Sequence, residues 1–433
     1  RIDRHIKHFK TNDFWKLDNL PKETQNYIPS LMAIIFISKN PEKYGFNITS
    51  ETSFQWTTKK INKSVKVDDI AKCANIDKKI LNQYKNQYSI ITINGLFQKN
   101  ESKIPSGISV NTFDKLNNTD KKFFHKFFNN QDDSKSDIFT SINTINYKES
   151  LLIKIDKNYS KKDHVNILNF IISNSGESIN HIRKLIVSNQ NSKSVFIEEF
   201  ISLDSIENFS TSVTEILQEE NSEMEYLNVQ NDENNFHFNS INISQKQNSI
   251  SNCFTFSYSG ALVRNNLNIK LKEKNCYSNM YGFYALREKS HVDNHTTVDH
   301  IDENSISNEH YKGIMDNNSN GVFNGKILVR KKAQKTNAFQ SNNNILLSDE
   351  AKINTKPQLE IWADDVKCSH GCTVGQLDKE AIFYLQSRGI SREKAISMLL
   401  GAFSEEIIEK IENQFIKQKI KKLTYKKLEY FTS

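Results

Sequence analysis

Short runs in which apolar and polar residues alternate dominate the chain from about Tyr147 onward. Alternation with a period of two is typical of a half-buried β-strand, because successive side chains of a strand point to opposite faces. No long amphipathic helix clearly interrupts the series, which argues against βαβ units. The apolar positions of these runs are Leu151, Ile153 and Ile155; Phe236 and Phe238; Ile241 and Ile243; Phe254, Phe256 and Tyr258; Leu267, Ile269 and Leu271; and Leu359, Ile361 and Ala363.

The strand series fits a sandwich, a barrel or a β-solenoid. No proline occurs between Pro105 and Pro357, as expected where ladder hydrogen bonds need every backbone N–H. The turns between the runs are rich in Asn, Ser and Asp. These turns and the length of the region favour a solenoid, and a large sandwich stays compatible with the pattern.

The region before the strand series reads as mixed and mostly helical. Helix formers from Asp68 to Gln87 predict one helix. The stretch Tyr88 to Phe97 predicts two short strands around the turn signal Asn94-Gly95. Residues 111–136 end the region in an expected loop, although the pairs Phe123-Phe124 and Phe127-Phe128 within it are typical of an amphipathic packing helix. Four of the five prolines break this region into short pieces: Pro21, Pro29, Pro41 and Pro105.

The chain becomes helical again after Gly375. Asp378 is a suitable N-cap for a helix over 379–388, and Gly389 follows at its C′ position. Ser391 is expected to cap a second helix over 392–403, and Ser404 a third that begins at Glu405. The end of this helical region, residues 417–427, is basic and is expected to be frayed.

Composition excludes several classes of protein. Of the 433 residues 37% are hydrophobic and 25% charged, which is typical of a globular protein. The longest apolar run, Leu31 to Ile37, is far too short to span a bilayer. The net charge of +7 comes from lysines spread along the chain among acidic residues, which argues against a nucleic-acid binder. Five cysteines are too few for a disulfide framework, so a reducing compartment is expected.

The sequence ADDVKCSHGCTVG contains the strongest candidate for chemistry. Cys368, His370 and Cys372 are two residues apart, so a strand that continues to Cys372 would place all three on one face. Thiolate and imidazole are ligands of zinc, copper and iron–sulfur clusters. A closed structural site needs four ligands, and no second cysteine pair follows. We therefore expect either an open, shared metal site or a buried cysteine and hydrogen-bonded histidine at a domain junction.

A second cluster combines histidines with acidic residues, but its spacing fits no helix face. Its members more often satisfy backbone groups than hold a metal, although zinc or iron is conceivable. The usual nucleotide-binding, hydrolase and metalloprotease motifs are missing, so the chain should have no ATP site of its own. The cluster contains His291, His295, His300 and His310 with Asp293, Asp299 and Glu309.

The residues from Gly321 to Phe403 resemble the SufB/SufD family of the SUF iron–sulfur cluster assembly system. The matching segments are GVFNGKILVRKKAQKTNAFQSNNNILLSDEA, KPQLEIWADDVKCSHG and TVGQLDKEAIFYLQSRGIS, with looser matches upstream at LVRNNLNIKL, HVDNHTTVDH and YKGIMD. The KCSHG and TVGQLD segments are those of SufD-type chains rather than of SufB-type chains. The first 145 residues or so match weakly.

The resemblance implies a mainly β fold, with a right-handed parallel β-helix core between helical terminal domains. The implied domains are 1–148, mixed and mostly helical; 149–372, the β-helix; and 373–433, a helical domain that binds the ATPase subunit. The implied partners are a SufB-like paralogue, paired through the β-helices, a SufC-like ABC ATPase and iron–sulfur acceptor proteins. The implied location is the bacterial cytoplasm, or the plastid stroma in a eukaryote.

The implied function is that of a SufD-like, noncatalytic scaffold subunit. The SufBCD-type complex would build a nascent iron–sulfur cluster, held transiently and shared with the SufB-like subunit, and pass it to acceptors. Cys368 and His370 match the functional Cys and His of the family, whereas Cys372 is doubtful. The alternative is a purely structural partner that stabilises SufB and SufC without cluster ligands. The implied ATPase-binding residues are Phe383, Tyr384, Leu385, Arg388, Gly389, Ile390 and Met398.

Overall fold

The computed structural model describes residues 87–128, 137–161, 163–172, 178–203 and 207–431. All of them belong to one compact unit of the chain, Ser64–Ser433. The helix expected at 68–87 and Cys73 lie outside the described residues, apart from Gln87 itself. Among the described residues, no helix is long and apolar enough to cross a membrane.

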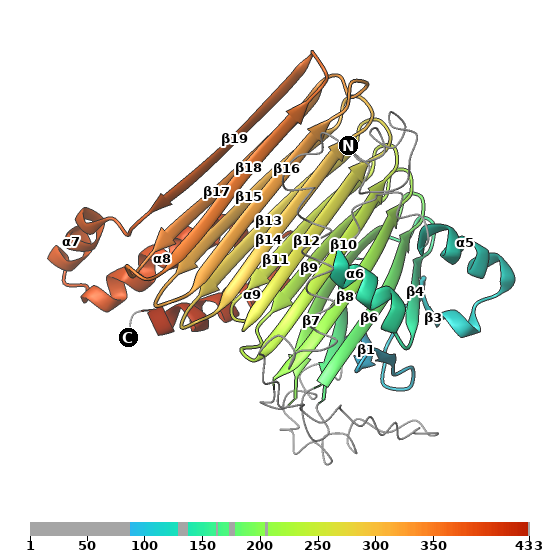
Figure 1. Cartoon of the computed structure of the whole chain (residues 1–433), viewed down its shortest axis with the longest axis horizontal. Helices are drawn as coiled ribbons and strands as arrows, with labels where there is room; N and C mark the ends of the chain where they lie inside the picture. The colour runs from blue at the N-terminus through green and yellow to red at the C-terminus, as the bar shows by residue number, and fades with distance from the viewer. Residues whose placement is uncertain (1–86, 129–136, 162, 173–177, 204–206, 432–433) are drawn as a thin grey trace, which may run out of the picture. The chain divides into compact units, whose positions relative to one another are not determined.

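Nineteen described strands form two sheets, and the chain crosses from one to the other after almost every strand (Figure 1). In the first sheet the order is β19 (Val366–Gly375), β17 (Thr336–Leu346), β15 (Ile306–Met315), β13 (Tyr277–Leu286), β11 (Ile250–Ser257), β9 (Glu223–Gln230), β7 (Lys193–Ser202), β5 (Val165–Ile171), β1 (Ser89–Ile93) and β2 (Leu96–Phe97). In the second sheet it is β18 (Lys352–Ile361), β16 (Asn320–Val329), β14 (His291–His300), β12 (Leu262–Leu271), β10 (Asn235–Gln245), β8 (Asn208–Gln218), β6 (Ser178–Ser188), β4 (Ser150–Ile155) and β3 (Ile108–Thr112).

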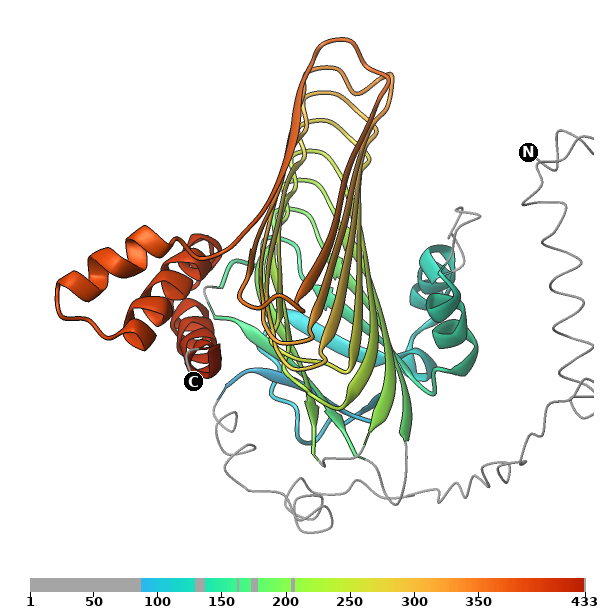
Figure 2. The same ribbon diagram turned by 60° about the vertical axis from the view of Figure 1, so that its left-hand side comes forward.

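From β4 onward every ladder between neighbouring strands is parallel, and the strands stack into a solenoid of about seven turns. Figure 2 shows the two sheets facing each other, joined by short connections at both edges. The predicted parallel β-helix is therefore confirmed, and the sandwich and barrel alternatives are wrong. The predicted hairpin at Asn94-Gly95 is also confirmed: both residues have positive φ, and β1 pairs antiparallel with β2.

An asparagine ladder explains the asparagine-rich turns. Asn191, Asn221, Asn248 and Asn275 adopt φ values of 56–59°, a region that Asn tolerates better than most residues. The side-chain amide of each donates to the side-chain carbonyl of the asparagine one turn earlier, starting at Asn158, over 2.9–3.0 Å. This ladder therefore aligns equivalent positions of successive turns along one edge of the solenoid.

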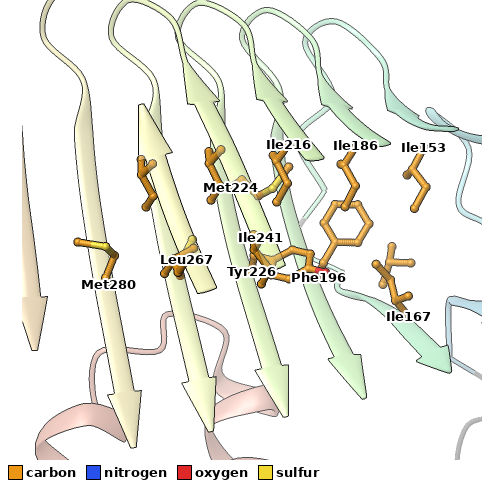
Figure 3. Packing of buried hydrophobic residues seen from close by; sticks show 14 of the residues in the cluster. Ile153, Ile167, Ile186, Phe196, Ile216, Met224, Tyr226, Ile241, Leu267 and Met280 are labelled. Carbon is orange, nitrogen blue, oxygen red and sulfur yellow. The ribbon is translucent and has the colours of Figure 1, made fainter. Parts of the chain in front are cut away.

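The space between the sheets is filled by ladders of apolar side chains. Ile153, Ile186 and Ile216 occupy successive rungs of the second sheet, and all three are buried (Figure 3). Phe196 and Tyr226 face them from the first sheet. Runs such as Leu151 to Ile155 and Leu267 to Leu271 thus alternate into this lumen, whereas Phe254 and Phe256 alternate onto the outer face of the first sheet.

Helices cover the outer faces of both sheets. On the second sheet α6 (Ile138–Asn146) stacks Phe139 on Phe238 with ring centroids 3.5 Å apart, and α5 (Asn118–Phe128) and the 3-10 helix η3 (Phe113–Lys115) contribute to a nearby cluster. The loop expected at 111–136 is therefore wrong at η3 and α5, because Phe124 packs there with Leu152 and Leu185. On the first sheet α8 (Arg392–Ile408) and α9 (Gln414–Leu428), followed by η4 (Glu429–Phe431), cover Phe254 and Phe256. Strand β11 is therefore buried on both faces, with polar residues such as Thr255 and Ser257 among its buried positions.

The C-terminal helices differ from the prediction at one boundary. Asp378 caps α7 (Lys379–Ser387) and Ser391 caps α8, as expected, and Gly389 has φ +83°. The expected break at Ser404 is wrong, because α8 continues to Ile408. The Ser404 hydroxyl donates to the Gly401 carbonyl within the helix instead of capping a new one. Asn413 is the N-cap of α9, and the basic residues 417–427 lie inside that helix. The fraying expected there is wrong, because Ile420 and Thr424 are buried and anchor the helix.

The solenoid ends at β18 and β19, which are half-buried or exposed at every position. Among the described strands each pairs with one neighbour only, β16 or β17. Pro357, which cannot donate to a ladder, lies in β18 at this edge. The last turn therefore presents two free strand edges.

Candidate functional site

Strand β19 holds Cys368, His370 and Cys372 on one face. The strand runs through all three positions, and they pair in register with Ala338, Gln340 and Asn342 of β17. Those three β17 residues are buried in the lumen. The two cysteines and the histidine therefore continue the lumen-facing side of the sheet onto the last, open turn.

Cys368 is the most enclosed of the three side chains. It is half-buried against Ala338, Ile327 and Ala363. Burial raises the pKa of its thiol above the ordinary value, and a hydrogen bond with the Ala338 backbone partly offsets this effect. Since the thiolate is the metal-binding form, a metal must displace this proton when it binds.

His370 and Cys372 are exposed, with Gly371 in open surroundings between them. Neighbouring members of the row are two residues apart, about 6.6 Å along a strand, so a pair can reach one metal centre. The whole row cannot, and among the described residues no three His, Cys, Asp or Glu side chains converge on a metal position. The donors fit an iron–sulfur cargo chemically, and they leave the ligand set incomplete.

The second candidate cluster is dispersed by the fold. His291, His295 and His310 lie on outer faces, whereas His300 faces the lumen and bonds the Ser307 hydroxyl over 2.9 Å. His295 Nε2 lies 2.9 Å from Asp293, which also pairs with an arginine. His291 and His310 likewise contact the side chains of Asn320 and Asn343, so the four histidines have local side-chain partners rather than the backbone partners that the sequence predicted.

A separate apolar surface lies on α7 and the start of α8. Phe383, Tyr384 and Met398 are 73%, 56% and 44% exposed. The Arg388 guanidinium lies over the Tyr384 ring and donates to its hydroxyl over 2.9 Å. Leu385 and Ile390 are half-buried, and Gly389 permits the tight turn between the helices. Six of the seven residues that the resemblance implied thus lie on α7 or in the turn after it, and Met398 lies on α8.

Sequence reasoning missed Glu309 as a lumen residue and did not single out Gln340. Both are buried side by side behind the row on β19. The available signal was an ionisable residue at a lumen position of β15, in the segment ISNEHYKGIM. Their proximity to His370 depends on strand register, which the sequence did not supply.

Comparison with known proteins gives consistent matches. A family model described as SUF system FeS cluster assembly, SufBD core domain, matches residues 170–403, and one described as SufBD protein N-terminal region matches residues 28–167. An iron–sulfur cluster assembly SufBD family protein of Synechocystis is 31% identical over 285 residues, which are 64% of this chain and 63% of that protein.

Two further relatives extend the comparison. The iron–sulfur cluster assembly protein SufD of Escherichia coli is 33% identical over 252 residues, covering 57% of this chain and 59% of that protein. A chloroplastic protein of Arabidopsis thaliana is 27% identical over 290 residues, covering 65% of this chain and 61% of that protein. The chain thus spans about 60% of the length of these relatives.

Proposed function

This chain belongs to the SufB/SufD family of SUF-system iron–sulfur cluster assembly proteins and is SufD-like within it, and from that premise we propose that it is a noncatalytic scaffold subunit. It helps a SufBCD-type complex to build a nascent cluster and pass it to acceptor proteins. The observation that carries this proposal is the row of Cys368, His370 and Cys372 on the open face of the last strand.

The incomplete ligand set supports a shared, transient cluster. Cys368 and His370 supply two donors, and the exposed side of β19 leaves room for donors from a partner. A cluster held by few ligands of one chain, one of them a neutral imidazole, is easier to release than one held by four thiolates. Cys372 is not one of the two proposed ligands, because its exposed thiol lacks the apolar contacts that hold Cys368.

Two surfaces are suited to the proposed partners. The free edges of β18 and β19 can pair with the β-helix of a SufB-like paralogue, because an open edge offers a row of hydrogen-bonding groups. The exposed aromatic and apolar side chains of α7 and α8 form the proposed surface for a SufC-like ABC ATPase. The ATPase then supplies nucleotide hydrolysis, and this chain needs no ATP site. The proposed location is the bacterial cytoplasm or the plastid stroma.

Substitution of the two proposed ligands tests the scaffold function. Cys368→Ser and His370→Ala should leave the three-protein complex assembled, because neither removes much buried apolar area. Iron and acid-labile sulfide per purified complex should fall to less than roughly a third in each, since each removes one of two local ligands. Cys372→Ala should have a smaller effect.

The alternative is a purely structural partner without cluster ligands. One observation supports it, namely the packing of Cys368 against Ile327 and Ala363. If packing were its only role, Cys368→Ser would lower the yield of complex while the iron content of each assembled complex stayed normal. Normal iron in both single mutants would reject cluster ligation and leave this chain as a stabilising partner of SufB and SufC.

A further inference from the structure

Four side chains on the lumen-facing side of the first sheet form a row that ends at His370. Met280 of β13, Glu309 of β15, Gln340 of β17 and His370 of β19 occupy successive rungs in register. The first three are 0%, 2% and 3% exposed, whereas His370 is exposed. Two polar side chains therefore lie inside the apolar lumen directly behind a proposed ligand.

Glu309 fixes the orientation of the Gln340 amide. The Gln340 Nε2 group donates to Glu309 Oε2 over 2.7 Å. Burial raises the pKa of Glu309 to about 7, and no neighbouring cation contributes to that shift. Because the amide NH₂ points to the carboxyl group, the Gln340 carbonyl oxygen is directed away from it.

The Gln340 carbonyl oxygen is a buried acceptor with no hydrogen-bond partner among the described residues. Buried polar atoms in folded proteins nearly always have a hydrogen-bond partner, so an unpaired one calls for an explanation. The opposite sheet makes room for this amide, because a Cβ at Gly325 would lie 2.3 Å from Gln340 Nε2. The Gln340 amide is therefore held by Glu309 of its own sheet and given space by Gly325 of the opposite sheet.

Among the described residues, the rung of Cys372 has no such unpaired acceptor behind it. Asn342, in register with Cys372, has its amide fully engaged. Its Nδ2 donates to the Tyr284 hydroxyl over 3.1 Å and to the Tyr311 carbonyl over 3.2 Å, and its Oδ1 accepts from Asn344 over 2.7 Å. In this row only the rung of His370 has a free acceptor behind it, within the part of the chain that the structure describes.

We propose that Gln340 is a positioning residue for His370, whose ring N–H donates to the Gln340 carbonyl oxygen when the other ring nitrogen binds a metal. Histidine ligands of metals generally donate their second N–H to such an acceptor, which sets the tautomer and the ring orientation. Glu309 acts one step further away by holding the amide. The inference rests on the proposed ligand role of His370.

The test is Zn²⁺ alone, titrated into the full chain against a chromophoric chelator. His370→Ala defines the affinity without this ligand. Gln340→Met keeps the length of the side chain, removes the acceptor and should weaken Zn²⁺ binding about tenfold. Gln340→Glu keeps an acceptor oxygen and should restore the affinity to within about threefold of wild type.

Two further variants separate positioning from stability. Asn343→Met is the matched control: Asn343 lies on the outer face of β17 and bonds Thr373 of β19 over 2.8 Å, so its loss perturbs the same two strands and should leave the affinity unchanged. Glu309→Gln preserves the volume of the side chain, but either of the two amides can then donate to the other. The Gln340 amide can therefore turn, and the affinity for Zn²⁺ should fall about threefold. This variant serves if Gln340→Met does not fold.

The outcomes distinguish the two proposals. If His370→Ala weakens Zn²⁺ binding while Gln340→Met and Glu309→Gln bind like wild type, the positioning role is wrong and the ligand role stands. Equal losses in Gln340→Met and Gln340→Glu would also reject positioning, because the acceptor would then be irrelevant. Wild-type affinity in His370→Ala would reject the ligand role, and the inference would fall with it.

Discussion

Several polar residues buried in the lumen form an ion pair or have a strongly shifted pKa. Lys184 and Glu198 form a fully buried pair at 2.6 Å, and Glu198 also accepts from the Asn169 amide over 2.7 Å. His237 and His300 are buried as well, and burial lowers the pKa of each to about 3. Such groups are held neutral or paired, so the folded state responds to pH through a few identifiable residues.

Replacement of His300 should improve stability in acid. The pKa of His300 is about 3 in the folded state and about 6.5 in the unfolded state. As pH falls below 6.5 the unfolded chain binds a proton that the folded chain refuses, so the unfolding free energy drops by about 1.4 kcal/mol per pH unit until about pH 3. Chemical denaturation at pH 7 and pH 5 should therefore show a smaller loss for His300→Gln than for wild type.

The control for this prediction lies on the same strand. His291 starts β14 and is half-buried on its outer face. His291→Gln should keep the acid sensitivity of wild type. An equal loss of stability between pH 7 and pH 5 in wild type and His300→Gln would show that the buried imidazole does not govern acid stability.

At the scale of elements, the C-terminal helices have two separate roles. Helices α8 and α9 bury Ile407, Ile408 and Ile416 against the outer face of the first sheet. Lys312 of β15 links the sheet to α8, since its ammonium lies 4.1 Å from the centre of the Phe403 ring and pairs with Glu406. Deletion of residues 378–433 would therefore expose this face of the solenoid, so surface substitutions are the cleaner test of partner binding.

Charges placed on the exposed part of α7 and α8 should block the ATPase partner. Phe383→Asp and Met398→Asp each put a carboxylate on the proposed surface, and each should weaken SufC capture at least roughly tenfold, or about 1.4 kcal/mol. Phe383 is 73% and Met398 44% exposed, so neither change removes a buried side chain and the thermal midpoint should stay near that of wild type. Quantitative pull-down with a SufC-like ATPase measures the effect.

Ile145→Asp provides the matched control, because Ile145 is 81% exposed on α6, on the other sheet. It adds the same charge at an exposed apolar position outside the proposed surface. Full SufC capture by both surface variants, or an equal loss in Ile145→Asp, would remove the assignment of this surface to the ATPase.

At the scale of the described unit, the strands of the solenoid differ in how well neighbouring strands and burial protect their backbone from solvent. Interior strands such as β10 have a neighbour on each side and alternate buried positions, whereas β18 and β19 each have one neighbour and no fully buried position. Strands of this kind open locally at low cost. The last turn is therefore the part that a SufB-like partner can stabilise most.

Hydrogen exchange should locate the proposed pairing. In the isolated chain, peptides from residues 352–375 should exchange faster than peptides from residues 235–245. Addition of the SufB-like partner should slow exchange in 352–375 and leave 235–245 unchanged, because new ladder bonds form only at the free edges. Slowed exchange elsewhere, with none at 352–375, would place the interface on another surface.

The sequence by itself determined the strand pattern, the asparagine-rich turns, the caps at Asp378 and Ser391, and the common face of Cys368 and His370. These features are local, because side-chain alternation, turn conformation and capping depend on residues a few positions apart. The family resemblance pointed to the solenoid and to the same two site residues. The prediction failed at Ser404, where packing of α8 on the sheet outweighed a local cap signal.

Only the tertiary structure decided which residues share a rung. Glu309, Gln340 and His370 are about 30 residues apart in sequence, and register alone makes them neighbours. Register depends on the length of every turn and on the apolar ladders that fill the lumen, so it is a property of the whole solenoid rather than of any strand. The open last turn was decided in the same way: the sequence left open whether a strand reaches Cys372, and among the described strands only β17 pairs with β19.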